Sequence, residues 1–407
     1  MRGTAKSGTD SRHVLALDGV RGLAIIVVML HHFTVLPAGG AAAGWILRLA
    51  EFGAHGVDLF FVLSGFLITS QLLGPQLDTA RIGRFYTRRA LRIVPLYYAI
   101  LIVVFLILPM ALRETGFTQK LATQTNFGGN WPWYALFASN FRNALDGRFT
   151  NPALDVSWSL AIEMQFYIVW PWVIRMCSRR ALKHMIWAVI LASPCLRTVA
   201  WCMDATWIQI LVLPFLRADI LMWGALLAIW MDESRSGEAM AAGALDRVRS
   251  SLPLIAPVIL LILLAGGWDR QNAFTSTLGY SLIGLAAAGI CSRVLTMPPG
   301  DWLRRFFESR GLVFISCYAY GLYLVHLPIR AVLRDVVFRP VDFSAWPPAP
   351  FAGQFVFYAF AGLASFLPAA ACWHFVENRF IQWGHRITSS SRVRAGDKTP
   401  SASADLR

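Results

Sequence analysis

Hydrophobic residues gather along this chain into about ten runs, each long enough to cross a hydrocarbon core of ~30 Å. Shorter polar segments separate the runs. The pattern therefore predicts an all-α fold, a polytopic transmembrane helical bundle of about ten spans. Pro194 and Arg197 interrupt the fifth run. The predicted spans are residues 17–37, 55–74, 94–112, 156–175, 184–202, 207–230, 252–267, 272–292, 311–333 and 353–376.

Composition supports the same class of protein. Hydrophobic residues make up 56% of the 407-residue chain, charged residues make up 15%, and the mean hydropathy is +0.52. That much apolar surface excludes a soluble globule of this length. We therefore expect one multi-pass domain that is integral to the lipid bilayer of a bacterial-type inner (plasma) membrane.

The basic residues predict the orientation of the chain. The net charge is +14, and with the N-terminus inside, about 25 of the 37 Lys and Arg residues fall in cytoplasmic segments, against about nine on the other side. The positive-inside rule then places both the N- and the C-terminus in the cytoplasm. Because this asymmetry and contact with anionic lipid account for the charge, we expect no nucleic-acid partner.

Both ends of the chain are polar. We expect residues 1–13 to form a polar N-terminal tail, residues 14–384 the membrane-embedded domain, and the Ser-rich residues 385–407 a disordered cytoplasmic tail. The six cysteines lie in or beside the predicted spans, without a CxxC motif or metal-ligand spacing. They are typical of small packing residues, and we expect no metal site.

Two polar residues in the first span, Arg21 and His32, are the most informative feature of the pattern. A charged side chain in a membrane span costs several kcal/mol unless it has a partner or a function. Eleven residues at ~100° each bring both side chains to one helix face, about 16 Å apart along the axis. One face of this helix therefore carries a cation near one end and an imidazole near the other.

Such charges fit either a membrane enzyme or a transporter. A transporter is expected to show related halves and unwound helices at mid-membrane. The charged positions of this chain cluster around one set of helices, and no second half repeats them. The pattern favours an enzyme, with a polytopic transporter or flippase as the alternative class.

Ordered segments of the chain resemble the motifs of the acyltransferase family 3 membrane proteins. The resemblance extends over residues 13–384. The segments are LDGVRGL at 17–23 followed by His32-Phe33, GVDLFFVLSGFLI at 56–68, RFYTRRALRIVP at 84–95, WSLAIEMQFY at 158–167 and YLVHLP at 323–328.

The resemblance implies transfer of an acyl group from cytoplasmic acyl-CoA, by default acetyl-CoA as co-substrate, to a hydroxyl group. The implied acceptor is a carbohydrate or glycolipid, such as a surface polysaccharide or its lipid-linked precursor, with a macrolide or other small molecule as the alternative. Two positions depart from the family pattern: Met164 stands where a second Glu is frequent, and Val156 where a His is common. Because no hydrolase-like domain follows the last predicted span, we expect the membrane domain to transfer the acyl group itself or to pass it to a partner.

Acyl transfer to an alcohol needs a base, because a hydroxyl group is a poor nucleophile near neutral pH. His32 suits this role, as the base or as an acyl carrier, since an imidazole has an unperturbed pKa of about 6.5. Asp58, near the outer start of the second span, is expected at a similar depth and could hold the tautomer of His32. Glu163, in the outer half of the fourth span, is expected to contact the acceptor hydroxyl or to act as an alternative base.

Other polar residues leave their roles open. His31, about 80° around the helix from Arg21, is expected to pack or to support His32. His55 and His326 are equally compatible with a structural and a functional role. Arg217 and Asp219 diverge by ~200° on their helix, so they cannot pair with each other along one face and are equally compatible with ion pairs to other helices and with a role at the substrate.

Arginines at the cytoplasmic end of the third span predict a donor site. Arg89 and Arg92 are three residues apart, which places them on one face of a short helix. Guanidinium groups bind phosphates bidentately, and coenzyme A is rich in phosphate. We therefore expect Arg89 and Arg92 to bind acyl-CoA, with Arg21 guiding the same donor inward. The alternative is that these arginines only set topology.

Overall fold

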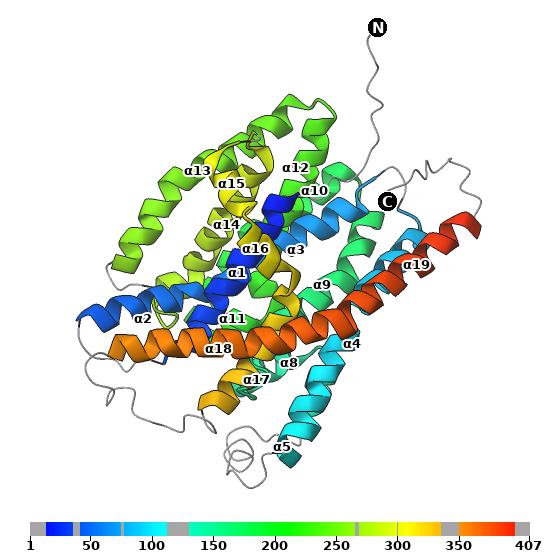
Figure 1. Cartoon of the computed structure of the whole chain (residues 1–407). Helices are drawn as coiled ribbons and strands as arrows, with labels where there is room; N and C mark the ends of the chain where they lie inside the picture. Colours follow the sequence, from blue (N-terminus) through cyan, green and yellow to red (C-terminus); the bar gives the residue numbers. More distant parts are fainter. Residues whose placement is uncertain are drawn as a thin grey trace.

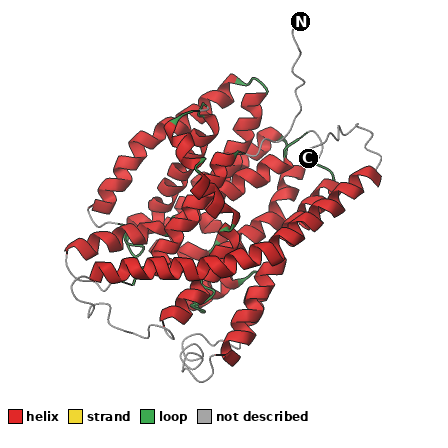
Figure 2. Ribbon diagram, viewed as in Figure 1, coloured by secondary structure: helices red, strands yellow, loops and turns green. Residues whose placement is uncertain are grey.

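The computed structural model describes residues 14–35, 41–74, 77–111, 130–264, 268–298, 300–334 and 350–394. Within these ranges the chain forms helices and connecting loops without a β-strand, and the helices pack into one bundle (Figures 1 and 2). The predicted all-α class is confirmed.

The helices follow the hydrophobic runs closely. Three segments of π-helix (η1, η3 and η6) continue or precede α-helices without a break. The elements are α1 (Leu15–Phe33), α2 (Ala41–Gly53), α3 (Gly56–Leu72), α4 (Thr79–Ile102), η1 (Val103–Ile107), α5 (Leu108–Ala111), α7 (Trp131–Ala135), α8 (Ser139–Asp146), α9 (Ser157–Met176), α10 (Arg179–Cys202), α11 (Trp207–Val212), α12 (Pro214–Arg235), α13 (Ala239–Leu264), η3 (Thr275–Gly279), α14 (Tyr280–Thr296), α15 (Trp302–Phe307), α16 (Arg310–Cys317), α17 (Ala319–Val332), α18 (Pro350–Cys372), η6 (Trp373–Glu377) and α19 (Asn378–Arg394).

Within the described residues, 7 helices are long and apolar enough to cross a membrane, or up to 8 if the bent pair α16–α17 is one span. The axes of that pair differ by 71°. The chain is thus a polytopic helical membrane protein. The count of about ten spans and the cytoplasmic position of both termini stay predictions.

Several helices differ from the expected boundaries. Helix α2 occupies residues between the first and second predicted spans. Helix α19 continues to Arg394, so the disorder expected from residue 385 on is wrong for residues 385–394. The end of the membrane-embedded domain at residue 384 stays a prediction. The expected tail at 1–13 and the rest of the expected C-terminal tail, 395–407, lie outside the described residues.

Helix α4 begins well before its hydrophobic run. Asp78 caps its N-terminus by accepting a hydrogen bond from the backbone N–H of Arg81 at 2.6 Å. The arginine-rich segment is therefore the first half of a long helix that also contains Pro95. As a result Arg89 and Arg92 project from a helix, as their spacing predicts.

Helices α3 and α12 share the most extensive helix–helix contact among the described residues. A Cβ atom added to Gly65 would lie 2.0 Å from the carbonyl oxygen of Leu221, and one added to Gly224 would lie 2.0 Å from that of Val62. Only glycine permits this backbone approach, a common device between membrane helices. The same two helices meet again near their N-terminal ends, where Asp58 and Arg217 form a buried ion pair.

Helix α1 lies in the interior of the bundle, against α2, α3, α16 and α17 (Figure 1). Its glycine-containing first half packs on α15 and α16, and its second half faces α17. The face that carries Arg21 and His32 therefore lies inside the protein rather than against lipid.

Candidate active site

Two cavities lie along this face of α1. The first, the arginine cavity, has a volume of about 110 Å³ and is lined by Arg21. The second, the histidine cavity, has a volume of about 190 Å³ and is lined by His32. Val57 and Tyr323 line both cavities and so form the partition between them. The two ends of one helix face thus open into two neighbouring chambers.

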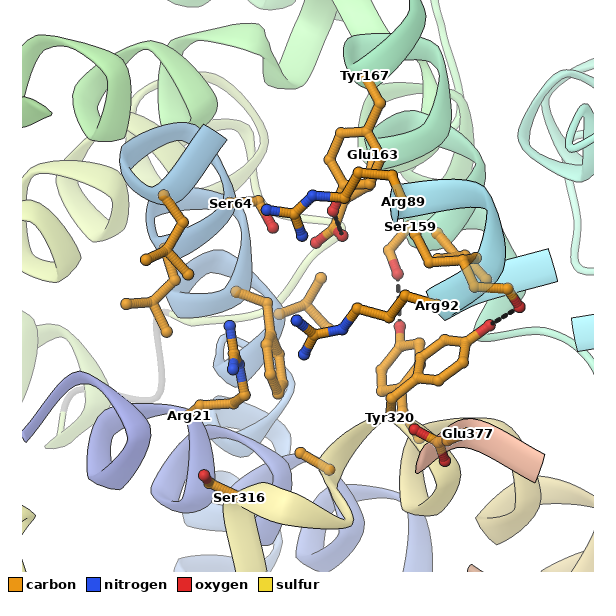
Figure 3. Close-up of a pocket in the computed structure, with 18 of the residues that line it drawn as sticks. Arg21, Ser64, Arg89, Arg92, Ser159, Glu163, Tyr167, Ser316, Tyr320 and Glu377 are labelled. Carbon is orange, nitrogen blue, oxygen red and sulfur yellow. Dashed lines mark hydrogen bonds between the residues drawn. The ribbon is translucent and has the colours of Figure 1, made fainter. Parts of the chain in front are cut away.

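The arginine cavity brings the three predicted donor-site arginines together. Figure 3 shows Arg21, from α1, and Arg89 and Arg92, from α4, directed into the same space. Arg89 donates a hydrogen bond to the side-chain oxygen of Gln71 at 3.2 Å, and Arg21 forms a long ion pair of 3.7 Å with Asp18. The sequence shows that Arg89 and Arg92 share a helix face and that Arg21 lies on another helix. The structure brings all three side chains to one cavity.

Two carboxyl groups, Glu163 and Glu377, face these three cations. Among the residues that line the cavity, three guanidinium groups stand against two carboxyl groups, and Asp18, which pairs with Arg21, lies outside this lining. A partly buried cation without a counter-charge is costly, so the cavity favours an anionic occupant. Guanidinium groups match phosphate oxygens in particular, because their N–H donors form a planar fork.

Glu163 belongs to the arginine cavity. It lines the arginine cavity and accepts a hydrogen bond from the hydroxyl of Tyr167 at 2.8 Å, one turn along α9 (Figure 3). Its expected contact with the acceptor hydroxyl, or its role as an alternative base, stays a prediction. Glu163 lies with the arginines rather than with His32.

In the histidine cavity, His32 pairs with His326. The Nδ1 of His326 lies 2.9 Å from the backbone carbonyl oxygen of Leu322, and its Nε2 lies 3.0 Å from Nδ1 of His32. A carbonyl oxygen only accepts, so Nδ1 of His326 carries a proton, and in a neutral ring Nε2 must then accept. Nδ1 of His32 is consequently the donor. The remaining nitrogen of His32, Nε2, bears a lone pair and has no hydrogen-bond partner in the described part of the chain.

Asp58 has a different partner from the one expected. Its Oδ2 accepts from Nδ1 of His55 at 2.6 Å, and its Oδ1 forms a buried ion pair with Arg217 of α12. The expected pairing of Asp58 with His32 is therefore wrong. His55 lies three residues before Asp58, so helix geometry places the two side chains within hydrogen-bond reach of each other.

His55 has both ring nitrogens engaged. Nδ1 donates to Asp58, and Nε2 accepts from the indole N–H of Trp268 at 2.6 Å. A base needs a free lone pair, so His55 is unsuited to proton abstraction in this arrangement. The Asp58–His55–Trp268 chain instead braces the wall of the cavity. Arg217 extends this chain through its ion pair with Asp58, and its guanidinium lies 3.8 Å from the ring centroid of Tyr280.

His31 is also committed. Its Nδ1 lies 2.9 Å from the carbonyl oxygen of Ala50, and its Nε2 lies 3.4 Å from a guanidinium nitrogen of Arg270. This supporting position matches the expectation for His31. Of the four histidines that line or support the cavity, His32 alone has an uncommitted nitrogen among the described residues.

Asp155 is a cavity residue that sequence reasoning missed. It lies in the turn before α9 and lines the histidine cavity. Burial raises the pKa of its carboxyl group to about 8, and the backbone N–H of Asn151, which donates to it at 3.2 Å, lowers the pKa by less. At neutral pH the group is mostly protonated and can donate a hydrogen bond. No motif marked it, because its environment comes from loop packing.

Arg217 and Asp219 each pair with another helix. Asp219 forms a fully buried ion pair with Arg197 of α10 at 2.9 Å, while Arg217 pairs with Asp58 of α3. Arg197, which interrupts a predicted span, is thereby neutralised inside the bundle and also donates to the carbonyl oxygen of Thr277. The expected divergence of Arg217 and Asp219 on α12 is confirmed.

The fold is that of a polytopic helical membrane protein with charged chambers inside it. The family model described as an acyltransferase domain matches residues 14–374, and the chain belongs to acyltransferase family 3. The predicted resemblance and the assignment as an acyltransferase are confirmed.

Two similar proteins carry the name of O-acetyltransferases. The chain is 25% identical over 348 residues to the peptidoglycan O-acetyltransferase OatA of Listeria monocytogenes, with 80% of this chain and 51% of the relative covered. It is 27% identical over 335 residues to YrhL of Bacillus subtilis, provisionally named a peptidoglycan O-acetyltransferase, with 80% and 50% covered. The chain thus spans about half the length of the curated relatives it matches. No solved structure matches it significantly.

Proposed function

We propose that this protein transfers an acyl group, by default acetyl, from cytoplasmic acyl-CoA to a hydroxyl group of a sugar-containing acceptor, with His32 as the base. The observation that carries the proposal is the free Nε2 of His32, at the end of a hydrogen-bond chain that sets its tautomer. This is the arrangement that a general base requires.

The donor site in this proposal is the arginine cavity. Its three guanidinium groups suit the phosphates of coenzyme A, and Arg21, Arg89 and Arg92 supply the donors. With the orientation that the basic residues predict, the Arg89 end of α4 faces the cytoplasm, where acyl-CoA is made available. In this orientation acyl-CoA enters the protein from the cytoplasm through the arginine cavity.

Transfer itself takes place across the partition. The thioester reaches past Val57 and Tyr323 toward the histidine cavity, since these residues line both chambers. Nε2 of His32 takes the proton of the acceptor hydroxyl while the oxygen attacks the thioester carbonyl. The carbon–sulfur bond breaks, the new ester forms, and the proton passes from His32 to the departing thiolate, so that free coenzyme A is released.

The acceptor in this proposal is a carbohydrate or glycolipid on the outer side of an inner membrane. The names of OatA and YrhL, which specify peptidoglycan as acceptor, support a saccharide. The chain spans only about half of these relatives, so the acceptor is proposed as a class rather than as peptidoglycan.

Turnover of labelled acyl-CoA tests the proposal against a transporter. Purified protein in proteoliposomes, given acetyl-labelled CoA and a saccharide acceptor, should release one free thiol for each acetyl ester formed. A transporter or flippase would move label across the bilayer with the thioester intact. Label that crosses without thiol release, or thiol release that does not depend on the protein, would overturn the proposal.

A further inference from the structure

The histidine cavity contains cations that the proposed base does not account for. Among the residues that line it, three guanidinium groups stand against two carboxyl groups, and these groups belong to Arg217, Arg270, Arg330, Asp58 and Asp155. A charged group inside a membrane protein is costly unless it has a partner or a function. The partners of these cations therefore show which of them is available to a ligand.

Arg217 is already neutralised inside the protein. It forms a buried ion pair with Oδ1 of Asp58, and Oδ2 of Asp58 accepts from His55 at 2.6 Å. The second carboxyl group, that of Asp155, has a pKa of about 8 and is mostly protonated at neutral pH. The lining of the cavity therefore offers no ionised, uncommitted carboxylate to a further cation.

Arg270 forms no ion pair with any residue that the structure describes. It lies in the segment between α13 and η3, with one guanidinium nitrogen 3.4 Å from Nε2 of His31 and the guanidinium carbon 5.5 Å from the ring centroid of Trp207. Because a guanidinium only donates, Nε2 of His31 accepts and that imidazole is neutral. Glu51 and Asp269 line a separate polar cavity of about 420 Å³ beside Arg270, and neither pairs with it. The contacts of Arg270 thus orient its side chain without supplying a negative charge.

The wall that contains Arg270 is not the wall on the donor side. Val57 and Tyr323 separate the histidine cavity from the arginine cavity. Arg270 and His31 separate it instead from the polar cavity. In the proposed reaction the thioester arrives at the wall of Val57 and Tyr323. A ligand group that binds Arg270 therefore belongs to the acceptor rather than to the donor.

Arg330 brings a second guanidinium group to the same cavity. It lies on α17 one turn after His326, the residue that orients His32. Guanidinium groups bind carboxylates and phosphates through two parallel N–H···O bonds. A cavity of about 190 Å³ thus presents an anion with two groups of this kind and, at neutral pH, with the protonated carboxyl group of Asp155.

We propose that Arg270, with Arg330 as a second residue of the same lining, binds an anionic group of the acceptor, a carboxylate or a phosphate, while His32 takes the proton of a hydroxyl group on the same molecule. A partly buried guanidinium without a counter-charge costs free energy in the empty cavity, and an acidic acceptor removes that cost when it binds. The inference rests on the proposed function and narrows it, because it makes the acceptor an acidic saccharide rather than a neutral one.

Direct binding tests this site without any need for acyl transfer. The full chain in nanodiscs of zwitterionic lipid is titrated with matched methyl glycosides of glucose, galactose and mannose: the uronic acid, its neutral primary amide and the 6-phosphate of the parent sugar. The uronic acid and the amide differ in charge but hardly in shape. At least one anionic member should bind about tenfold more tightly than its amide, because charge-assisted hydrogen bonds are stronger than neutral ones. Whether that member is the uronic acid or the phosphate identifies the anion.

Three variants assign the preference to Arg270. Arg270→Gln should weaken binding of the anionic glycoside about tenfold and leave the amide unchanged, because only the charge pair is lost. Arg270→Lys should retain part of the preference, since an ammonium group meets an anion as a point charge without the planar fork. Arg148→Gln is the matched control. It removes an exposed arginine in the loop before α9 that does not line the histidine cavity, and it should change neither affinity.

Equal affinity for the uronic acid, the 6-phosphate and the amide throughout the panel would overturn the proposal. A preference for the anion that survives Arg270→Gln would overturn it as well. If the double replacement of Arg89 and Arg92 with Lys removes that preference instead, the anion binds in the arginine cavity.

The titration contains no acyl-CoA, so failure of the proposed acyl transfer leaves the binding result interpretable. A chain that binds acidic glycosides through Arg270 but never releases thiol would retain the anion site and lose the transferase reaction. Where transfer is measured, Arg270→Gln should raise the KM of the acidic acceptor about tenfold. A fall in kcat of the same size for acidic and neutral acceptors, with KM unchanged, would assign Arg270 to the reacting atoms and overturn its role in acceptor binding.

Discussion

Nε2 of His326 lies 3.0 Å from Nδ1 of His32, and this contact joins two helices that are far apart in the sequence. The Leu322 carbonyl oxygen orients His326, and His326 in turn orients His32. The chain of hydrogen bonds ends on a nitrogen that faces the cavity with its lone pair free. A histidine therefore takes the orienting position that a carboxylate holds in a Ser-His-Asp triad.

Replacement of His326 tests this orienting role. His326→Ala should lower kcat about 10- to 100-fold and shift the pH profile, because Nδ1 of His32 loses its acceptor and both tautomers become populated. His326→Gln should recover part of the rate, since its amide oxygen can accept from Nδ1. Equal loss of rate in both variants, with a pH profile like that of the wild type, would show that His326 is only a packing residue.

The Asp58–Arg217 ion pair predicts a stability effect. Asp58→Ala should reduce the stability of the purified protein by about 3–5 kcal/mol, because it leaves Arg217 buried without its counter-charge. Adding Arg217→Met should restore much of the loss. Thermal unfolding in detergent measures both effects. A fully stable but inactive Asp58→Ala variant would instead indicate that Asp58 takes part in catalysis.

Arg89 and Arg92 predict an effect on the donor alone. Replacing both with Lys keeps the positive charge, so membrane orientation should survive, but it removes the planar fork that matches a phosphate. The KM for acyl-CoA should rise about tenfold, with activity partly recovered at saturation. The same change at Arg84 and Arg88, which do not line the arginine cavity, is the matched control. An unchanged KM in the Arg89/Arg92 variant would mean that this pair only sets topology.

Asp155 predicts a pH dependence of acceptor binding. Its carboxyl group, with a pKa of about 8, is a hydrogen-bond donor below that pH and a carboxylate above it. The acceptor KM should therefore rise between pH 7 and pH 9 as the donor is lost. Asp155→Asn, which keeps a neutral donor, should give a flat profile over the same range. A rise of the same size in both proteins would assign the titration to another group.

Sequence patterns predicted most of the helices and which candidate residues share a helix face, for identifiable reasons. Hydrophobic runs mark helices in a membrane because every backbone group must be satisfied within its own segment. The face shared by Arg21 and His32, and that shared by Arg89 and Arg92, follow from helix periodicity alone. These positions all line the two chambers.

What could not be predicted depends on contacts between helices. Periodicity says which face a residue occupies but not which neighbour it meets, so Asp58 was paired with His32 rather than with His55. Periodicity likewise does not show that Glu163 shares a cavity with Arg21, Arg89 and Arg92. The 71° bend between α16 and α17, which carries His326 into the site, has no periodic signal. A sequence motif identified His326 as a candidate residue, but only the structure shows that its partner is His32.

The most direct test of the account is acyl transfer by a His32→Ala variant, compared with His31→Ala. The two histidines are neighbours on one helix, but only His32 has a free nitrogen in the cavity. His32→Ala should insert normally, bind acyl-CoA normally and transfer acyl groups at below about one per cent of the wild-type rate. His31→Ala should retain most of its activity. Transfer at the wild-type rate by correctly inserted His32→Ala protein would contradict the assignment of His32 as the base.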